Sequence, residues 1–260
     1  MKKQYTNAIV TEKRDLGGGI TEMWLMAPDV AAQAVPGQFV ALYCSDGSRL
    51  LPRPISICDV DEERQKLRLV FRLAGAGTRE LAATRVFEGI PLLGPLGNGY
   101  PPNVGERPLL VGGGIGIPPM LFLAKQLRRQ GRDVSVVLGY RDSRMFLAEE
   151  FSEYADVFAA TDDGSAGTKG TVVDAIRENG LTFDWLGACG PMPMLRGIKA
   201  LAEQRNVPAY LSLEERMACG IGACLGCVCK TKNRDAHTHV NNSRICKEGP
   251  VFEAQEVEIG

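Results

Sequence analysis

The sequence has no excess of charge of either sign. Its 30 lysines and arginines stand against 31 acidic residues, which leaves a net charge of -1. Binding to nucleic acid needs a basic surplus or a clear basic stripe, because phosphates must be neutralised. We therefore expect no nucleic-acid partner.

Long hydrophobic runs are also missing. The most apolar stretch, residues 108–124 (PLLVGGGIGIPPMLFLA), is interrupted by glycines and prolines, which is typical of a strand, a turn and a helix. The basic start MKKQYTNAIV has no apolar core behind it, so we expect no signal peptide and no membrane association. These absences predict a cytoplasmic protein, and cytoplasmic thiols stay reduced.

Cysteine, by contrast, occurs eight times, which in a reducing compartment indicates metal or redox chemistry rather than disulfides. Cys219, Cys224 and Cys227 follow the spacing C-x4-C-x2-C, and Cys246 comes later. This is the ligand order of plant-type [2Fe-2S] clusters. Glycines between these cysteines would let the backbone approach such a cluster closely.

Other ligand sets remain open at this point. Four cysteines can also hold a structural zinc ion, although zinc sites usually use paired C-x2-C knuckles. Cys229 lies two residues after Cys227 and could compete with Cys246 as a ligand, or pack as a buried thiol. His237 and His239 could complete a Rieske-like set, but we interpret them as surface residues.

The order of patterns predicts a multi-domain β plus α/β fold. Residues 1–102 contain short alternating runs between turn residues, which predict an antiparallel β-barrel. Residues 103–215 alternate strand and helix patterns, including a helix at 146–155, as in a doubly wound parallel sheet. Residues 216–260 predict a small cysteine-rich loop subdomain that closes with a strand at 249–259.

A glycine-rich turn opens the second domain. Gly112, Gly113, Gly114 and Gly116 stand between a strand pattern and a helix pattern. Backbone without Cβ atoms can approach a pyrophosphate, and the following helix N-terminus offers free N–H groups. The motif reads G-x-G-x-x-P, so it departs from the standard dinucleotide fingerprint, and a tight packing turn is the alternative.

Two further segments of this domain are candidates for contact with a nucleotide. Cys189 and Gly190 end a strand pattern, where a small thiol next to glycine leaves room for a flat ring. A buried cysteine before a helix is the alternative. Asp162 and Asp163 end another strand pattern and could contact ribose or cap a turn.

The barrel region contains two candidate anion sites. In LLPRPISI, Arg53 and Ser56 flank a proline, which favours a barrel rim where the arginine could bind phosphate. In GAGTREL, Gly77 and Thr78 precede a short helix pattern and form a second possible cradle. Each is unremarkable alone, but together they predict a second phosphate-bearing cofactor. Cys44 and Cys58 are interpreted as core residues, as their β patterns suggest.

The whole chain resembles the ferredoxin–NADP reductase superfamily. The resemblance rests on RPIS, GAGT, GGGIGIPP, CGP and the terminal cysteine loop. More closely, SLEERMACGIGACLGC with CKEGPVF is similar to the electron-transfer subunits of class 1B dihydroorotate dehydrogenases.

This resemblance implies a set of cofactor residues. NAD would dock over Gly112, Gly113, Gly114 and Gly116 with its nicotinamide near Cys189. The [2Fe-2S] ligands would be Cys219, Cys224, Cys227 and Cys246. FAD would lie on the barrel against Arg53, Pro54, Ile55, Ser56, Leu69, Val70, Phe71, Gly77 and Thr78.

The same resemblance implies a function. Electrons would pass from the FMN of a dihydroorotate dehydrogenase catalytic subunit through [2Fe-2S] and FAD to NAD+, in de novo pyrimidine (UMP) biosynthesis. Two copies of each subunit would form a heterotetramer. The alternatives are the small subunit of an NADH-dependent ferredoxin–NADP oxidoreductase or of a sulfide dehydrogenase, and a non-enzymatic zinc module that senses nucleotides. Arg141 and Arg144 leave a preference for NADP open.

Overall fold

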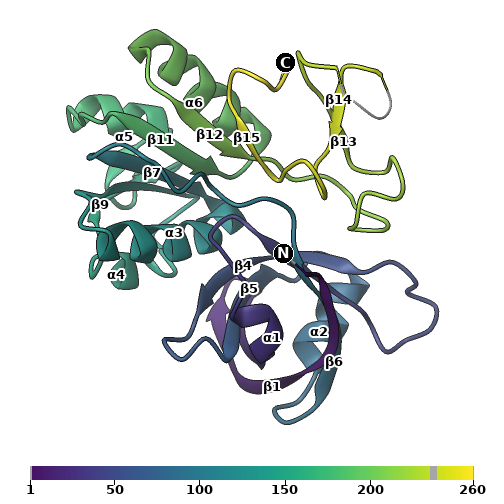
Figure 1. Cartoon of the computed structure of the whole chain (residues 1–260). Coiled ribbons are helices and arrows are strands. Elements are labelled where there is room, and N and C mark those ends of the chain that lie inside the picture. Colours follow the sequence, from purple (N-terminus) through teal and green to yellow (C-terminus); the bar gives the residue numbers. More distant parts are fainter. Residues whose placement is uncertain (1, 235–238, 260) are drawn as a thin grey trace.

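The first part of the chain forms a closed barrel. The computed structural model describes residues 2–234 and 239–259, and the barrel lies at the foot of Figure 1. Its six antiparallel strands run in the order β1-β2-β5-β4-β3-β6, so the predicted barrel is confirmed. The elements of this part are β1 (Gln4–Gly17), β2 (Ile20–Met26), α1 (Pro28–Ala31), β3 (Phe39–Leu42), β4 (Arg53–Val60), β5 (Lys66–Arg72), α2 (Ala76–Ala83) and β6 (Gly89–Leu96).

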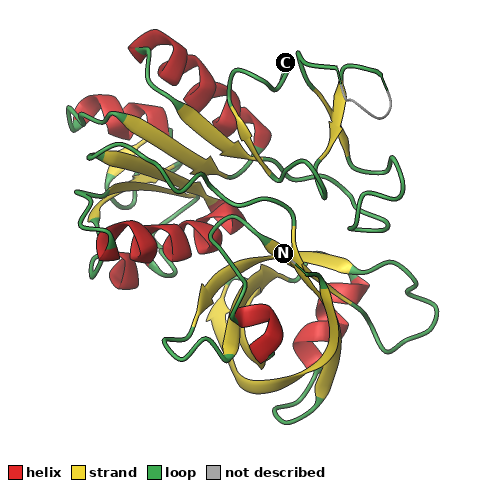
Figure 2. Ribbon diagram, in the orientation of Figure 1, coloured by secondary structure: helices red, strands yellow, loops and turns green. Residues whose placement is uncertain are grey.

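The second part is a parallel sheet with helices on both faces (Figure 2), as predicted. Its strand order is β10-β9-β8-β7-β11-β12-β15, and only β15 is antiparallel to its neighbour. Leu109 and Val111 pack with residues of α5 and α6, whereas Leu110 packs with residues of α3. The elements are β7 (Pro108–Gly113), η1 (Gly114–Gly116), α3 (Ile117–Arg129), β8 (Ser135–Tyr140), α4 (Ala148–Phe151), β9 (Asp156–Thr161), β10 (Thr168–Lys169), α5 (Val172–Glu178), β11 (Trp185–Cys189), α6 (Met192–Arg205), β12 (Ala209–Ser212) and β15 (Val251–Glu253).

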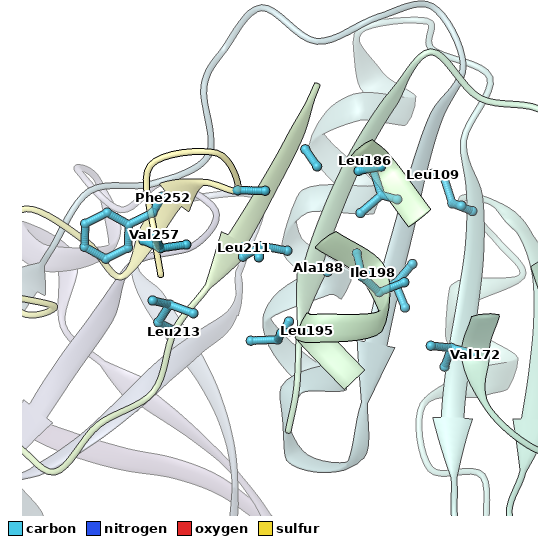
Figure 3. Packing of buried hydrophobic residues seen from close by; sticks show 14 of the residues in the cluster. Leu109, Val172, Leu186, Ala188, Leu195, Ile198, Leu211, Leu213, Phe252 and Val257 are labelled. Carbon is cyan, nitrogen blue, oxygen red and sulfur yellow. The ribbon is translucent and has the colours of Figure 1, made fainter. Parts of the chain in front are cut away.

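The cysteine-rich segment is held to this sheet at both ends. It leaves β12, forms a small hairpin of β13 (Val228–Lys230) and β14 (Asn242–Arg244), and returns as β15 beside β12. Figure 3 shows Phe252 and Val257 of the returning chain packed near Leu211 and Leu213. The described helices include none that is long and apolar enough to cross a bilayer.

Two predicted elements are shorter than their patterns suggest. The helix expected at 146–155 is the single turn α4, and it starts only at Ala148 because Leu147 before it has a left-handed backbone with φ +64°. The strand expected at 249–259 is only β15, which joins the parallel sheet instead of closing a separate subdomain. The patterns do not indicate β1, whose second half is largely exposed, or β6, which contains two prolines.

A buried ion network joins the barrel to the sheet domain. Arg68 of β5, only 4% exposed, donates to Glu22 at 2.5 and 3.0 Å and to Glu150 of α4 at 2.7 and 2.8 Å. Lys125 of α3 donates to Asp59 of β4 at 2.6 Å and to Glu150 at 2.9 Å. Burial raises the pKa of Asp59, and the bond from Lys125 opposes this rise. The network therefore fixes α3 and α4 against the barrel.

Replacing Lys125 with methionine is expected to lower the free energy of unfolding by about 3–5 kcal/mol. The change removes one partner of a buried ion pair and leaves Asp59 without its cation. Urea titration followed by intrinsic fluorescence measures the loss. Arg129→Met on the same helix is the control, because its pair with Glu62 spans 3.7 Å with both side chains exposed. That pair should contribute at most about 1 kcal/mol, and equal losses in the two variants would contradict the role given to the network.

Candidate functional site

The four predicted cluster ligands lie in two pairs. The Sγ atoms of Cys219 and Cys224 are 3.3 Å apart, and the N–H of Cys224 points to the Sγ of Cys219 at 3.4 Å. The N–H of Cys246 points to the Sγ of Cys227 at 3.4 Å. Cys227 and Cys246 are buried, whereas the first pair is partly exposed. The loop thus presents one pair of thiols near solvent and one pair inside.

Hydrogen bonds and burial act in opposite directions on these thiols. Burial raises the pKa of Cys219, but backbone N–H groups, foremost that of Ile221, outweigh it and lower the pKa to about 6. Burial and the neighbouring Cys227 raise the pKa of Cys246 to about 12. A bound metal takes cysteines as thiolates, so it would remove the proton that Cys246 otherwise keeps.

The paired arrangement fits a two-iron cluster better than a single zinc ion. One tetrahedral zinc would need all four sulfurs within about 3.8 Å of one another. Across residues 2–234 and 239–259, no three His, Cys, Asp or Glu side chains converge on one metal position. A [2Fe-2S] core instead takes two protein ligands on each iron. The donor set therefore fits the predicted cluster.

Neither sulfur pair includes the other candidate ligands. Cys229 is on β13 opposite Ser243, half-buried against the core of the sheet domain. Burial raises its pKa to about 11, as expected for a packing thiol. His239 is exposed, and His237 lies outside the described residues.

The two predicted anion sites of the barrel come together. The Arg53 side chain lies over the backbone of Gly77, so closely that a Cβ there would overlap the guanidinium. Gly77 is in the first turn of α2, where Thr78 Oγ1 accepts hydrogen bonds from the N–H groups of Ala74 at 2.9 Å and Gly75 at 3.1 Å. A guanidinium beside a helix N-terminus favours a phosphate. This cradle fits the pyrophosphate of a dinucleotide.

The remaining predicted flavin residues lie on two adjacent barrel strands. They are Pro54, Ile55 and Ser56 on β4 and Leu69, Val70 and Phe71 on β5. The side chains of the β5 residues are at most 3% exposed. Leu69 and Phe71 face the barrel core, and Val70 faces the cluster that contains α3. A flavin beside Leu69, Val70 and Phe71 would therefore meet their backbone rather than their side chains.

The interpretation of Cys44 and Cys58 as core residues fits Cys58, which is fully buried, whereas Cys44 is half-buried.

The cysteine loop lies on the barrel directly beside this segment. A Cβ at Gly220 would be 3.5 Å from Leu96 and 3.8 Å from Ala41. Ala41 on β3 is in turn the register partner of Pro54 on β4. Because neighbouring strands are about 4.8 Å apart, a single strand separates the cysteine loop from the predicted flavin residues.

The glycine-rich turn lies where the sequence predicts it. Gly112 and Gly113 end β7, and Gly114, with a left-handed φ of +55°, starts the turn into α3. A Cβ at Gly116 would overlap the carbonyl of Cys189 at the end of β11. The turn is therefore tightly packed. A phosphate here would meet the backbone of the glycine turn rather than the first turn of α3, because Pro118 and Pro119 have no N–H and the N–H of Ile117 donates to the Gly114 carbonyl.

A cavity of about 870 Å³ lies between this turn and the barrel. Gly114 and Gly190 line it from the sheet domain, and Gly18 lines it from the β1–β2 hairpin. Cys189 is fully buried behind this lining, and burial raises its pKa. Of the two aspartates, Asp162 lines the cavity, whereas Asp163 accepts a hydrogen bond from the N–H of Ser165 at 2.9 Å and so caps a turn.

Three cavity residues carry no local motif in the sequence. Arg72 ends β5 and reaches to within 3.7 Å of the Cβ position of Gly114. Glu214 lies in the segment after β12. Loss of solvent within the cavity raises the pKa of this carboxyl, and the positive charge of Arg72 opposes part of the rise. Asp142 lies in the loop after β8. Only the end of a strand pattern, where ligands bind in α/β sheets, could have pointed to Arg72 and Asp142.

Comparison with known proteins identifies similar chains. The model described as the iron-sulfur cluster binding domain of dihydroorotate dehydrogenase B matches residues 214–258. The chain is 44% identical to a dihydroorotate dehydrogenase B (NAD(+)) electron transfer subunit of Geobacillus sp. (strain WCH70), with 100% of both chains covered. The same subunit of Bacillus pumilus (strain SAFR-032) is 43% identical, with 100% of this chain and 99% of the relative covered.

Solved structures agree on the fold. An NADH-dependent reduced ferredoxin-NADP oxidoreductase structure superposes with a TM-score of 0.87 and 29% identity, covering 97% of this chain and 90% of the other. The ferredoxin reductase of carbazole 1,9a-dioxygenase has a TM-score of 0.69 and 20% identity, covering 81% and 69%.

Proposed function

The chain belongs to the family of dihydroorotate dehydrogenase B electron transfer subunits, and from this membership we propose how its residues divide the work. It is an oxidoreductase subunit that uses FAD and an iron–sulfur cluster. In this proposal residues 1–102 hold FAD, residues 103–215 bind NAD, and residues 216–260 hold the cluster. The route runs from a catalytic partner to NAD+ in pyrimidine biosynthesis.

One observation carries this proposal: the three candidate sites lie in series. The cysteine loop approaches Ala41 at Gly220, and Ala41 is paired with Pro54 at the candidate flavin site. On the other side, β5 leads from Phe71 to Arg72, which lines the cavity beside Gly114. A flavin held between these two points would be close to both the cluster and the nicotinamide.

The residues have separate tasks in this scheme. Cys219, Cys224, Cys227 and Cys246 would ligate the cluster, which accepts single electrons, and the flavin would exchange these for a hydride. Arg53, Gly77 and Thr78 hold the flavin phosphates. The glycine turn orients NAD. Cys189 is a positioning residue, because its side chain is fully buried behind the part of the cavity wall that Gly190 lines.

The catalytic partner would dock over the cysteine loop. Ile221 is 40% exposed and Leu225 is 59% exposed, and both lie between the predicted ligands. Exposed apolar side chains of this kind favour a protein contact. We propose that the partner is an FMN-containing subunit that oxidises dihydroorotate and that two copies of each subunit assemble.

The test is anaerobic purification of the chain with and without that FMN subunit. We expect about two iron atoms and about one FAD per chain, and dihydroorotate-dependent reduction of NAD+ only when both subunits are present. Absorption spectra, iron analysis and flavin release measure the cofactors.

Two results would contradict the proposal. A colourless protein without iron or flavin would remove the redox function itself. A coloured protein that is inactive with the FMN subunit, but active with a larger flavin and multi-cluster subunit, would favour the ferredoxin–NADP oxidoreductase alternative, which the similarity of that solved structure keeps open.

A further inference from the structure

The far end of the cavity contains an acid and two arginines. β8 ends at Tyr140, and the loop that follows places Arg141, Asp142 and Arg144 in the cavity lining. In βαβ nucleotide sites the residue after the second strand decides the cofactor. An acid there accepts from the 2′-hydroxyl of NAD, and an arginine accommodates the 2′-phosphate of NADP. This loop contains both kinds of side chain.

Asp142 and Arg144 form an ion pair within this loop. Arg144 donates from Nε to Asp142 Oδ1 at 3.0 Å and from Nη2 to Oδ2 at 2.6 Å, and its backbone N–H also donates to Oδ1 at 3.0 Å. These bonds lower the pKa of Asp142 to about 2, so the acid stays ionised at neutral pH. Both carboxylate oxygens are thus turned toward Arg144.

The β1–β2 hairpin of the barrel approaches this arginine from the other side, while the Arg144 side chain stays 75% exposed. Nη1 of Arg144 lies 4.0 Å from the position of a Cβ on Gly18, at the tip of the β1–β2 hairpin. Gly18 has φ +59°, a conformation that glycine adopts without strain. The guanidinium therefore lies between the carboxylate and the hairpin, and its Nε and Nη2 donors are directed to Asp142.

We propose that Asp142 makes this site selective for NAD(H) over NADP(H) by holding Arg144 in an internal ion pair. The inference rests on the proposed function, because it concerns the nicotinamide nucleotide of the same cavity. With the pair intact, a 2′-phosphate meets the negative charge of Asp142 and an arginine whose Nε and Nη2 donors are directed to that carboxylate. Without Asp142, Arg144 becomes available to a phosphate.

The experiment uses the holo protein and an artificial dye that accepts electrons from the flavin. In Asp142→Ala, kcat/KM with NADPH should rise by about tenfold to a hundredfold. Calorimetry provides a readout without turnover: 2′-phospho-AMP should bind the variant more tightly than it binds the parent, and AMP should not. In Asp142→Ala/Arg144→Ala both gains should disappear.

Controls separate this inference from the proposed function. Glu88→Ala breaks an exposed ion pair with Arg85 away from the cavity and should leave the NADH to NADPH ratio unchanged. An Asp142→Ala protein with unchanged NADPH activity, or a double variant that keeps the gain, would overturn the role of the ion pair while NADH oxidation persists. A parent protein that oxidises neither nucleotide would instead overturn the proposed function.

Discussion

Cys224→Ser is expected to abolish electron exchange with the catalytic subunit while NADH-to-dye activity through FAD remains. Cys224 shares a pair with Cys219 at 3.3 Å, and serine does not replace a thiolate as an iron ligand in that pair. The candidate flavin residues lie on β4, β5 and α2, so we expect the loss of one cluster ligand to leave them in place. Both activities are measured on one preparation. Dihydroorotate-dependent NAD+ reduction reports electron exchange with the catalytic subunit, and reduction of ferricyanide by NADH reports the activity through FAD.

Cys229→Ser is the matched control for this variant. The two cysteines are five residues apart, but Cys229 lies on β13 opposite Ser243 and outside both sulfur pairs. Cys229→Ser should therefore keep the cluster absorbance and both activities. If the two variants bleached to the same extent, Cys229 would be a ligand. If Cys224→Ser lost both activities equally, the order of carriers would be wrong.

Local patterns predicted the parts of the fold that depend on neighbouring residues. The strand and helix alternation of 103–215 predicted the doubly wound sheet, because each element buries one face against the next. The cysteine spacing predicted a four-thiol site, because a short loop determines which side chains can meet. The pattern could not give the start of α4, since the left-handed backbone at Leu147 delays the first helical residue to Ala148.

The rest of the site depends on contacts between distant segments. Glu214 and Arg72 line the same cavity only because the segment after β12 returns to the end of β5. Ala41 lies between the candidate cluster site and the candidate flavin site because β3 pairs with β4 and because the cysteine loop passes beside β3. Asp142 and Arg144 are close in the sequence, yet their bidentate pairing and their place in the cavity emerge only from the fold. Residue spacing along the sequence cannot predict such contacts between distant segments.

Gly116→Ala is expected to lower kcat/KM for NADH by about a hundredfold without loss of the flavin or cluster bands. The added Cβ would overlap the carbonyl of Cys189 and lie 2.6 Å from the backbone nitrogen of Gly190. Both obstacles are backbone atoms, so the turn must move, and overpacking of this kind costs about 1–3 kcal/mol of stability. A displacement of the glycine-rich turn by about 1 Å is enough to lower kcat/KM a hundredfold.

Steady-state kinetics with ferricyanide and the visible spectrum of the purified variant test this expectation together. Gly47→Ala is the control, because a Cβ at that exposed loop position meets nothing within 4 Å and its kinetics should match the parent. The glycine-rich turn belongs to the parallel sheet, whereas the candidate flavin phosphate site belongs to the barrel. The flavin and cluster absorbance should therefore stay unchanged in a variant that no longer binds NADH. Normal NADH kinetics would mean that the nucleotide does not use this turn, and a bleached spectrum would mean that Gly116 supports the whole molecule rather than one site.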